Sequence, residues 1–257
     1  MTTFASWNVN SVKARLEGID RWLRESPPDV LMLQETKCET HKFPYDFFQD
    51  FGYNVEVVGQ KSYNGVAICS KHPIDVIGTC LPGDEADTQA RYLDVVTDNH
   101  RAICVYVPNG NPKGSEKFAY KQAWTQRLYD HLKEQINHLD SMVIGGDFNI
   151  VPEDKDCYDP KALADDAVFD PHAVALWRSI THLGLYDAFR LANTQAGHFS
   201  YWGHRQRAWD HDHGMRIDHF LISGKSCDLM EDCSIDRAPR GWPRPSDHTP
   251  IWLTLKS

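Results

Sequence analysis

Met142-Val143-Ile144-Gly145-Gly146-Asp147-Phe148-Asn149 is the stretch around which the rest of the chain can be organised. A short apolar run that ends in two glycines predicts a buried strand with polar side chains at its carboxyl end. Because strand side chains alternate, Asp147 and Asn149 share a face while Phe148 points the other way, into packing. Gly-Asp-x-Asn also fits a plain turn with an Asx hydrogen bond, so the remaining sequence must decide between a site and a turn.

A strand–helix–strand unit is predicted at the beginning of the chain. Residues 3–10 alternate like a strand, and residues 11–25 carry apolar side chains at helical spacing until two prolines end the helix. Residues 29–35 form a second apolar run, which is typical of a strand buried on both faces. A right-handed connection would bring the two strand ends, with Asn8 and Glu35, close together.

The middle and the end of the chain predict two mixed sheets with helices outside them. Short β-branched or aromatic segments split by turn dipeptides indicate hairpins over residues 53–58, 65–70, 74–80, 91–97 and 101–107. Residues 115–139 predict a long helix with a core stripe formed by Trp124, Leu128, Leu132 and Ile136. A helix near 172–183 follows, and the last strands are predicted at 198–202, 216–223, 230–236 and 249–255.

The composition fits a single α/β domain. The chain has 257 residues, 41% of them hydrophobic, and no linker, repeat or low-complexity tract divides it. No leader peptide or bilayer-spanning stretch is evident, so we expect a soluble, cytoplasmic protein without a membrane partner, and a monomer. Seven cysteines without a Cys-x-x-Cys motif indicate neither a disulfide framework nor a cysteine zinc site, and we expect reduced core thiols.

The net charge of −9 argues mildly against a nucleic-acid partner, because phosphate neutralisation normally needs a basic face. One segment, residues 152–170, accounts for much of the excess. Its only basic residues are Lys155 and Lys161. Its acidic residues are Glu153, Asp154, Asp156, Asp159, Asp165, Asp166 and Asp170. We interpret this segment as a solvated acidic loop, which leaves room for a basic groove elsewhere.

Five polar clusters stand at strand ends or in loops: Asn8, Glu35, Asp147 with Asn149, Asp218, and Asp247 with His248. Each cluster also has a purely structural explanation. Asn8 could cap the following helix, Glu35 could be a surface charge, and the last cluster could be a turn capped by the preceding serine. Asp218 could pair with Arg216 or Arg207. Because every cluster follows or lies in an apolar strand-like segment, their coincidence favours a shared cleft.

Metal-assisted attack on a phosphodiester is the chemistry that suits these residue types. A hard divalent ion such as Mg²⁺ prefers carboxylate and amide oxygens, which Glu35, Asp247 and Asn8 could supply. Asp218 with His248 would form a carboxylate-oriented histidine that acts as acid, base or phosphate partner. Zinc fits less well, because no His-Glu-x-x-His motif is present and the His-rich residues 209–213 read first as an exposed loop.

The sequence resembles the exonuclease III family of apurinic/apyrimidinic (AP) endonucleases, within the wider endonuclease/exonuclease/phosphatase fold. The resemblance runs from near residue 4 to near 253 and rests on seven ordered motifs, Trp7-Asn8-Val9-Asn10, Leu33-Gln34-Glu35-Thr36-Lys37, Tyr63-Asn64-Gly65-Val66-Ala67, Tyr106-Val107-Pro108-Asn109-Gly110, Gly146-Asp147-Phe148-Asn149, Arg216-Ile217-Asp218 and Ser246-Asp247-His248. It implies a four-layer α/β sandwich. It also implies Mg²⁺- or Mn²⁺-dependent hydrolysis on the 5′ side of an abasic site in duplex DNA, with exonuclease and 3′-end-repair activities known in the same family.

The resemblance also implies roles for individual residues. Glu35 with Asn8 and Asp247 would hold the metal, and Asp147 would orient or deprotonate the attacking water. Asn149 would hydrogen-bond the phosphate or the transition state and touch a second metal position.

Further residues would bind the substrate in the same comparison. His248, oriented by Asp218, would contact the scissile phosphate, and the phenol of Tyr106 would support the same charge. Lys37 and Asn109 are candidate phosphate contacts. A pocket for the extruded abasic sugar would be lined by Tyr201, Met215 and Ile217, for which core packing is the alternative reading.

One departure concerns the loop at 111–115, which carries the single cation Lys113 where some relatives insert an arginine into the duplex. Fold resemblance alone does not settle the substrate. The same fold serves RNA exonucleases and inositol-phosphate phosphatases, and a non-catalytic nucleic-acid-binding relative is a further alternative.

Overall fold

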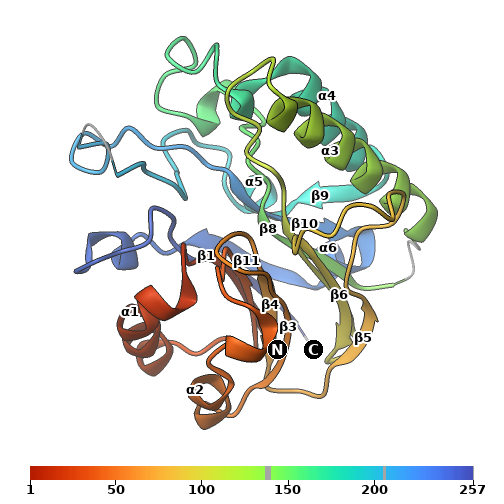
Figure 1. The fold of residues 1–257 in the computed structure, drawn as a ribbon, viewed down its shortest axis with the longest axis vertical. Coiled ribbons are helices and arrows are strands. Elements are labelled where there is room, and N and C mark those ends of the chain that lie inside the picture. The colour runs from red at the N-terminus through yellow and green to blue at the C-terminus, as the bar shows by residue number, and fades with distance from the viewer. Residues whose placement is uncertain (137–139, 205–206, 257) are drawn as a thin grey trace.

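Two six-stranded sheets pack against each other in the computed structural model, which describes residues 1–136, 140–204 and 207–256 (Figure 1). The first sheet has the order β11 (Met230–Ile235), β12 (Ile251–Leu255), β1 (Thr2–Asn8), β2 (Val30–Gln34), β4 (Val66–Ser70) and β3 (Asn54–Val58). The second has the order β5 (Asp75–Gly78), β6 (Tyr92–Thr97), β7 (His100–Tyr106), β8 (Met142–Asp147), β10 (Asp218–Ser223) and β9 (Leu185–Asp187). Both sheets are mixed, as the sequence predicts.

Helices cover the outer faces of the sheets and complete the predicted four layers (Figure 1). They are α1 (Val12–Glu25), α2 (Tyr45–Asp50), α3 (Glu116–Gln135), α4 (Pro171–Thr181), α5 (Ala188–Ala192) and α6 (Gly224–Leu229), with short 3₁₀ turns at Thr40–Lys42, Asp154–Asp156, Ala167–Phe169 and Ala238–Gly241. The apolar stripe of α3 packs with α4 on the second sheet, where Trp124, Leu128 and Leu132 are buried. Helices α1 and α2 pack on the outer face of the first sheet, and a further core cluster fills the space between the sheets.

The strand pairings bring the predicted polar clusters to one edge of the sandwich. β1 and β2 are parallel and pair Asn8 with Gln34, so their carboxyl ends coincide. β7 and β8 are parallel and pair Tyr106 with Asp147, and the first residue of antiparallel β10, Asp218, also faces Asp147.

The two glycines of the central stretch allow this close approach. A Cβ on Gly146 would lie 1.9 Å from the carbonyl oxygen of Val105 in β7, and one on Gly145 would lie 2.6 Å from the sulfur of Met32 in the other sheet. A side chain at either position would therefore collide with its neighbours, since real Cβ atoms do not approach other atoms so closely.

Several sequence-based boundaries are wrong. No strand forms at 198–202, because Tyr201 makes only isolated bridges with Met215 and His248. The helix predicted over 115–139 ends at Gln135, since Ile136 is extended, and residues 137–139 lie outside the described residues. The short elements α2, α5, α6 and β9 are not predicted by the sequence pattern, because each is shorter than two periods of its hydrophobic repeat.

The interpretation of residues 152–170 as a solvated acidic loop is wrong for Asp156, which is fully buried. It forms ion pairs with Arg216 and Arg190, and Arg216 pairs in addition with Asp187. Ion pairs therefore join the loop to Arg216, just before β10, and to Arg190 of α5. Asp170 is also buried and caps α4 through the backbone amides of His172 and Ala173.

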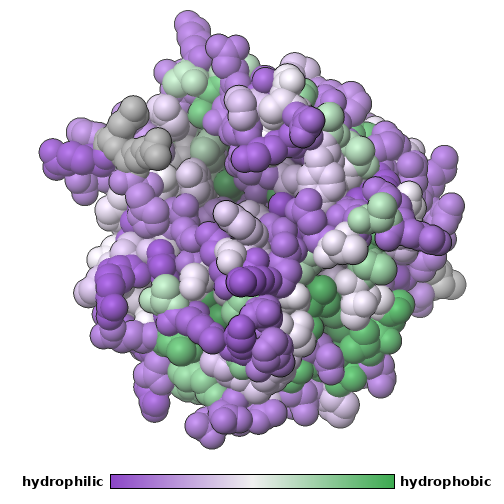
Figure 2. Space-filling view, in the orientation of Figure 1, coloured by the Kyte–Doolittle hydropathy of each residue, from purple (hydrophilic) through white to green (hydrophobic). Residues whose placement is uncertain are grey.

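The cysteines agree with the expectation of core thiols. All seven cysteines are free, and most are buried. The described residues contain no helix with both the length and the apolar character needed to cross a membrane. On the face shown in Figure 2 the surface is mainly hydrophilic, and hydrophobic side chains gather at the lower right, over β5 and β6. Two large hydrophobic side chains of β5, Val76 and Ile77, are exposed.

Candidate active site

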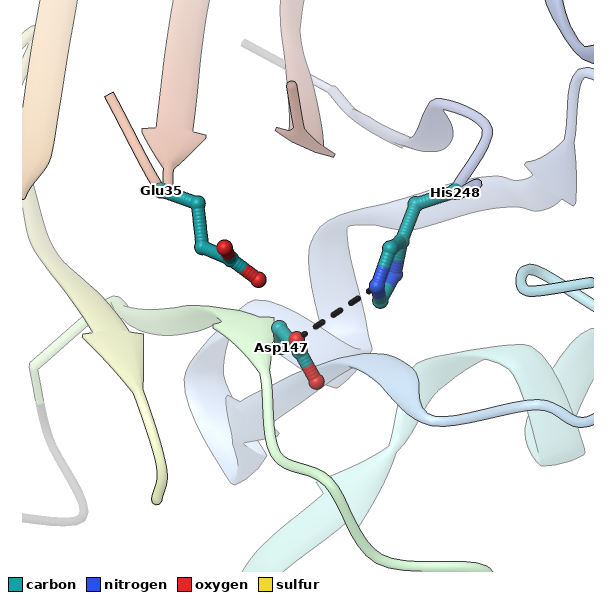
Figure 3. Close-up of side chains that lie close together, drawn as sticks. All are labelled: Glu35, Asp147 and His248. Atoms are coloured by element: carbon teal, nitrogen blue, oxygen red, sulfur yellow. Dashed lines mark ion pairs between the residues drawn. The ribbon is translucent and has the colours of Figure 1, made fainter. Parts of the chain in front are cut away.

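Three ionisable side chains converge at the edge where the strands end (Figure 3). Glu35 follows β2, Asp147 ends β8, and His248 lies on the loop before β12. One potential ligand atom from each lies within 4.8 Å of the others. They face a pocket of about 360 Å³, so groups that are far apart in the sequence share one small space.

Most of the residues predicted for the site line this pocket: Glu35, Tyr106, Asn109, Asp147, Asn149, Tyr201, Met215, Ile217, Asp247 and His248. The other three, Asn8, Lys37 and Asp218, are not among the lining residues but contact them: Asn8 and Lys37 contact Glu35, and Asp218 bonds to His248. The pocket lining also includes Asn111, Asp166 and Val168, which the sequence analysis does not assign to the site.

Asn8 bridges the two central carboxylates. Its buried amide nitrogen donates to Glu35 Oε1 and to Asp147 Oδ2, both at 2.9 Å, while its oxygen accepts from the backbone of Asn10. The N-cap of α1 is Ser11, so the capping explanation of Asn8 is wrong. Asn8 presents nitrogen and not oxygen to this cluster, and in this orientation it fixes the carboxylates relative to each other.

Glu35 is held on its other side by a cation. Lys37 Nζ lies 2.8 Å from Glu35 Oε2 and donates to Asn10 Oδ1 at 2.6 Å. Burial by itself would raise the pKa of Glu35, but the hydrogen bonds from Asn8 and Lys37 hold that pKa below its usual value. Glu35 is therefore a partly buried carboxylate in its charged form, held by two partners, and not the free surface charge that the sequence leaves open.

His248 lies between two carboxylates. Its Nδ1 bonds to Asp218 Oδ2 at 2.8 Å, and its Nε2 lies 3.7 Å from Asp147 Oδ2. Burial alone would lower the pKa of His248, but Asp218 and Asp147 raise it to about 10. The imidazole is therefore a cation at neutral pH, with Nε2–H directed at the centre of the site.

For Asp147, burial favours the neutral form of the side chain, whereas His248 is held in its charged form. Burial raises the pKa of Asp147 to about 7 even though the His248 cation opposes the shift. Its Oδ1 accepts from the backbone N–H of Asn149 at 2.9 Å, which is the Asx hydrogen bond anticipated for a turn. The turn and the site are thus the same structure, and a carboxylate with a pKa near neutrality is suited to exchange a proton.

Asp218 is oriented by a serine that the sequence does not single out. Ser200 Oγ donates to Asp218 Oδ2 at 2.7 Å and accepts from the Asp218 backbone. The alternative pairing of Asp218 with Arg216 or Arg207 is wrong, because Arg216 bonds to Asp156 and Asp187, and Arg207 bonds to Asp210.

Asn149 is fixed in one orientation. Its amide nitrogen donates to the carbonyl of Val107 at 2.9 Å, and its oxygen accepts from Asn109 Nδ2 at 3.0 Å. An amide nitrogen carries two N–H groups, so one remains for a ligand in the pocket. The ammonium of Lys121, a residue that no sequence motif singles out, donates to the backbone carbonyls of both Asn109 and Asn149.

Tyr106 completes the polar side of the pocket. Burial raises the pKa of its phenol well above the ordinary value, and the Glu35 and Asp147 carboxylates add to the shift. The hydroxyl is therefore a neutral hydrogen-bond donor. The guanidinium of Arg91 lies 4.6 Å above the ring, which holds the phenol in place by a cation–π contact.

The opposite wall is apolar. Ile217 is buried with Val151 and Val168 in a small cluster of its own, and Tyr201 and Met215 pack against it while facing the pocket. The Tyr201 ring also meets His248 edge to face, with centroids 4.8 Å apart. These side chains pack in a hydrophobic cluster and also line the pocket, so a packing role and a pocket-lining role do not exclude each other.

Asp247 lies at the rim and is anchored by Asn10 Nδ2 at 2.9 Å. Ser246 Oγ accepts from the His248 backbone and donates to the carbonyl of Asn8, so the predicted serine-capped turn exists and ties this loop to β1. The His-rich segment is exposed, as predicted, with His211 and His213 on the surface.

The donor set fits a hard divalent cation. Glu35 and Asp147 offer carboxylate oxygens, which such ions prefer, whereas the cationic His248 has no lone pair to give. A larger hollow of about 1000 Å³ lies at the opposite end of the strands, beside Thr2 and Ser141. Within the described ranges the one cluster able to hold a metal lies in the smaller pocket, and we place the candidate site there.

Comparisons with known proteins agree with this geometry. The Endonuclease/Exonuclease/phosphatase family model matches residues 5–248. The chain is 32% identical over 269 residues to exodeoxyribonuclease III of Haemophilus influenzae, covering 98% of this chain and 99% of that one. An AP endonuclease from Archaeoglobus fulgidus superposes with a TM-score of 0.96 at 32% identity, with full coverage of both chains.

A solved structure with bound nucleic acid is equally similar. It is a 3′ phosphatase from Neisseria bound to product DNA hairpin, with a TM-score of 0.96, 33% identity and full coverage of both chains. These relatives include an AP endonuclease, an exodeoxyribonuclease and a 3′ phosphatase. The chain therefore belongs to the endonuclease/exonuclease/phosphatase family and, within it, to the exonuclease III group of AP endonucleases.

Proposed function

We propose that this protein is a divalent-metal-dependent DNA-repair phosphodiesterase that cleaves duplex DNA on the 5′ side of abasic sites. Removal of 3′ nucleotides and of 3′ blocking groups would use the same site. The observation that carries the proposal is the joint presence of Glu35, Asp147 and the Asp218-paired His248 around one pocket. The relatives with DNA-directed activities support DNA as the substrate.

Mg²⁺, or Mn²⁺ in its place, would be held by Glu35 and Asp147, with Asp247 as a further ligand. The family resemblance also implies Asn8 and Asn149, whose amides would have to turn to offer oxygen, because in this structure both direct nitrogen to the site. When bound, the ion would supply positive charge that stabilises the charge developing on the phosphate oxygens. The described donors are oxygen-rich and contain no cysteine, which favours these ions over zinc.

Asp147 would take the proton of the attacking water or orient it. The hydrogen bonds from the Asn8 side chain and the Asn149 backbone hold its carboxylate in a single orientation for that step. The His248 cation beside it would contact the scissile phosphate through Nε2–H. Asp218 keeps this imidazole charged and aimed at the pocket.

The remaining polar side chains would bind the phosphate and its neighbours. Asn149 would donate its second amide N–H and Tyr106 its phenolic hydrogen to the phosphate oxygens, since both donors are held in place before substrate arrives. Asn109 and Lys37 would make further phosphate contacts. An extruded abasic sugar would lie against the wall formed by Tyr201, Met215 and Ile217. The apolar side chains of this wall would not replace the hydrogen bonds that a base makes in the duplex.

The experiment is cleavage of a labelled duplex that carries one tetrahydrofuran abasic analogue. We expect cleavage 5′ to the analogue when Mg²⁺ is added and none in EDTA. Asp147→Asn should reduce kcat by roughly 10²–10⁴-fold, the range for loss of a general acid or base. Glu231→Gln, at an exposed position on β11, removes the same charge away from the site and should leave kcat unchanged.

Duplexes with an intact 3′ end, a 3′ phosphate and a recessed 3′ end separate the three activities on the same gel. Full activity of Asp147→Asn would exclude the role given to that residue. An inactive wild-type protein on every DNA substrate, together with turnover of RNA or of inositol phosphates, would assign the chain to another branch of the fold.

A further inference from the structure

One lysine of α3 lies inside the protein. Lys121 is 0% exposed, and its ammonium group donates three hydrogen bonds, to the carbonyl oxygens of Asn149 at 2.6 Å, Ala167 at 3.0 Å and Asn109 at 3.1 Å. An ammonium has three N–H groups and no acceptor, so its hydrogen-bonding capacity is fully used. Among the described residues, none of its direct partners is a carboxylate.

The three carbonyls belong to three different segments that build the pocket. Asn109 lies on the loop after β7, and Asn149 on the loop after β8. Ala167 lies between Asp166 and Val168, which both line the pocket. Lys121 therefore joins, at one buried point, loops that are separated by up to 58 residues in the sequence.

The loops are also joined to each other on the pocket side. Asn111 Nδ2 donates to Asp166 Oδ1 at 2.8 Å, and Asn111 Oδ1 accepts from the Ala167 backbone at 2.9 Å. Asn109 Nδ2 donates to Asn149 Oδ1. The Lys121 ammonium thus bonds to the backbone of loops that are also hydrogen-bonded to each other through their side chains. One of these side-chain bonds reaches Asn149.

The sequence makes room for this lysine. Gly110 has φ +86°, and a Cβ there would lie 2.6 Å from Lys121 Cδ. On α3 the lysine occupies the position one turn before Trp124 and Thr125, on the buried stripe that continues with Leu128. Packing alone would favour an apolar residue at this point, because a buried charge pays a desolvation cost that is repaid only by its hydrogen bonds.

We propose that Lys121 is a positioning residue, whose buried ammonium fixes the loops after β7 and β8 so that the Asn149 amide and the Asn109 amide are presented to the substrate phosphate. The backbone of Asn149 has φ +49°, an uncommon conformation for a residue other than glycine, and the bond to its carbonyl helps to hold it. The kinetic part of this proposal rests on the proposed function, and the structural part does not.

Lys121→Met tests the proposal, because methionine keeps most of the volume and removes the three donors. The matched control is Leu128→Ala, which removes packing from the buried face of the same helix about two turns beyond Lys121 and leaves the three hydrogen bonds of the ammonium in place. In hydrogen–deuterium exchange below the melting temperature of both variants, we expect faster exchange over residues 107–111, 147–151 and 164–169 in Lys121→Met alone. Equal protection of these segments in the two variants would overturn the proposal, whatever the enzyme's substrate.

Kinetics on the abasic duplex provides the second readout. We expect Lys121→Met to lower kcat by roughly 10²-fold, as small displacements of positioned groups do, while Leu128→Ala retains wild-type kcat. In an Asn149→Ala background the effect of Lys121→Met should shrink to about threefold or less, because residues that act through one another are not additive. An undiminished effect in that background would mean that Lys121 does not act through Asn149.

If Lys121→Met does not fold, Lys121→Gln replaces it, because glutamine is polar but shorter and uncharged and cannot supply three N–H groups to the three carbonyls. It should give the same pattern of exchange and the same dependence on Asn149. Wild-type exchange and wild-type kcat in Lys121→Gln would refute the proposal. An inactive wild-type protein would count against the proposed function and leave the exchange result to decide the role of Lys121.

Discussion

Replacing Asp156 by asparagine should destabilise the protein strongly, although the residue lies in a loop that looks solvent-exposed in the sequence. Its carboxylate is fully buried and receives Arg216 Nε at 2.6 Å and Arg216 Nη2 at 3.1 Å, together with Arg190. Asparagine has nearly the same shape but no charge. The variant therefore removes one carboxylate from a buried group of charges and creates no cavity.

The size of the stability loss depends on the partners that Arg216 keeps in the Asp156→Asn variant. Arg216 is itself 0% exposed and would keep only Asp187 as a charged partner. Breaking a buried ion pair from one side costs about 3–5 kcal/mol, because the remaining charge stays desolvated. For a protein of this size each kcal/mol lowers the melting temperature by about 2–4 °C, so we expect a fall on the order of 10 °C.

The assay is thermal and urea unfolding followed by circular dichroism, with Asp165→Asn as the control. Asp165 is an exposed acid of the same loop, and its replacement changes the net charge equally. We expect the control to stay within about 0.5 kcal/mol of the wild type, as surface substitutions usually do. A loss below about 1 kcal/mol for Asp156→Asn would refute the argument that this network is held by buried charge.

Two further predictions concern pH and metal binding. Burial would raise the pKa of Asp156, but Arg216 and Arg190 hold that pKa below its usual value in the folded protein. The contribution of the Asp156 carboxylate to stability is therefore fully present above the unfolded pKa of about 3.9. It is lost as the pH falls through the folded pKa. The stability difference between wild type and Asp156→Asn should therefore be constant above about pH 5 and shrink below about pH 4, and a constant difference down to pH 2 in urea titrations would contradict this. Glu35→Gln should weaken Mn²⁺ binding at least about tenfold in calorimetry, since a hard ion loses a charged oxygen, whereas Glu231→Gln should bind as the wild type does. Equal affinity in the two variants would remove Glu35 from the metal site.

The local sequence determines the strands and the polar residues at their ends. Apolar runs followed by Asn8, Glu35 and Asp147 have a period and a composition that specify buried strands and oxygen donors without reference to the rest of the chain. The long helix α3 is specified in the same way by its apolar stripe. Elements shorter than two periods of their hydrophobic repeat, such as β9 and α5, are not predicted, because so short a segment does not repeat its pattern.

Burial and partner choice are decided only by the tertiary structure. The sequence shows that Asp156 is acidic, but only the fold places it beside two arginines and out of water. The same holds for Lys121, whose charge predicts a surface position until the loops supply three carbonyls. These contacts join residues that are distant in the chain.

Protonation states follow the same division. The sequence provides His248, Asp218 and Asp147 as titratable groups with ordinary pKa values, and their chemistry follows from distance and desolvation. Folding brings Asp218 to 2.8 Å from the imidazole and removes Asp147 from water, which raises the pKa of both His248 and Asp147. The sequence by itself therefore determined which groups could do the chemistry. The tertiary structure decided which of them carry a proton, because electrostatic interaction and desolvation depend on distances in space and not on separation along the chain.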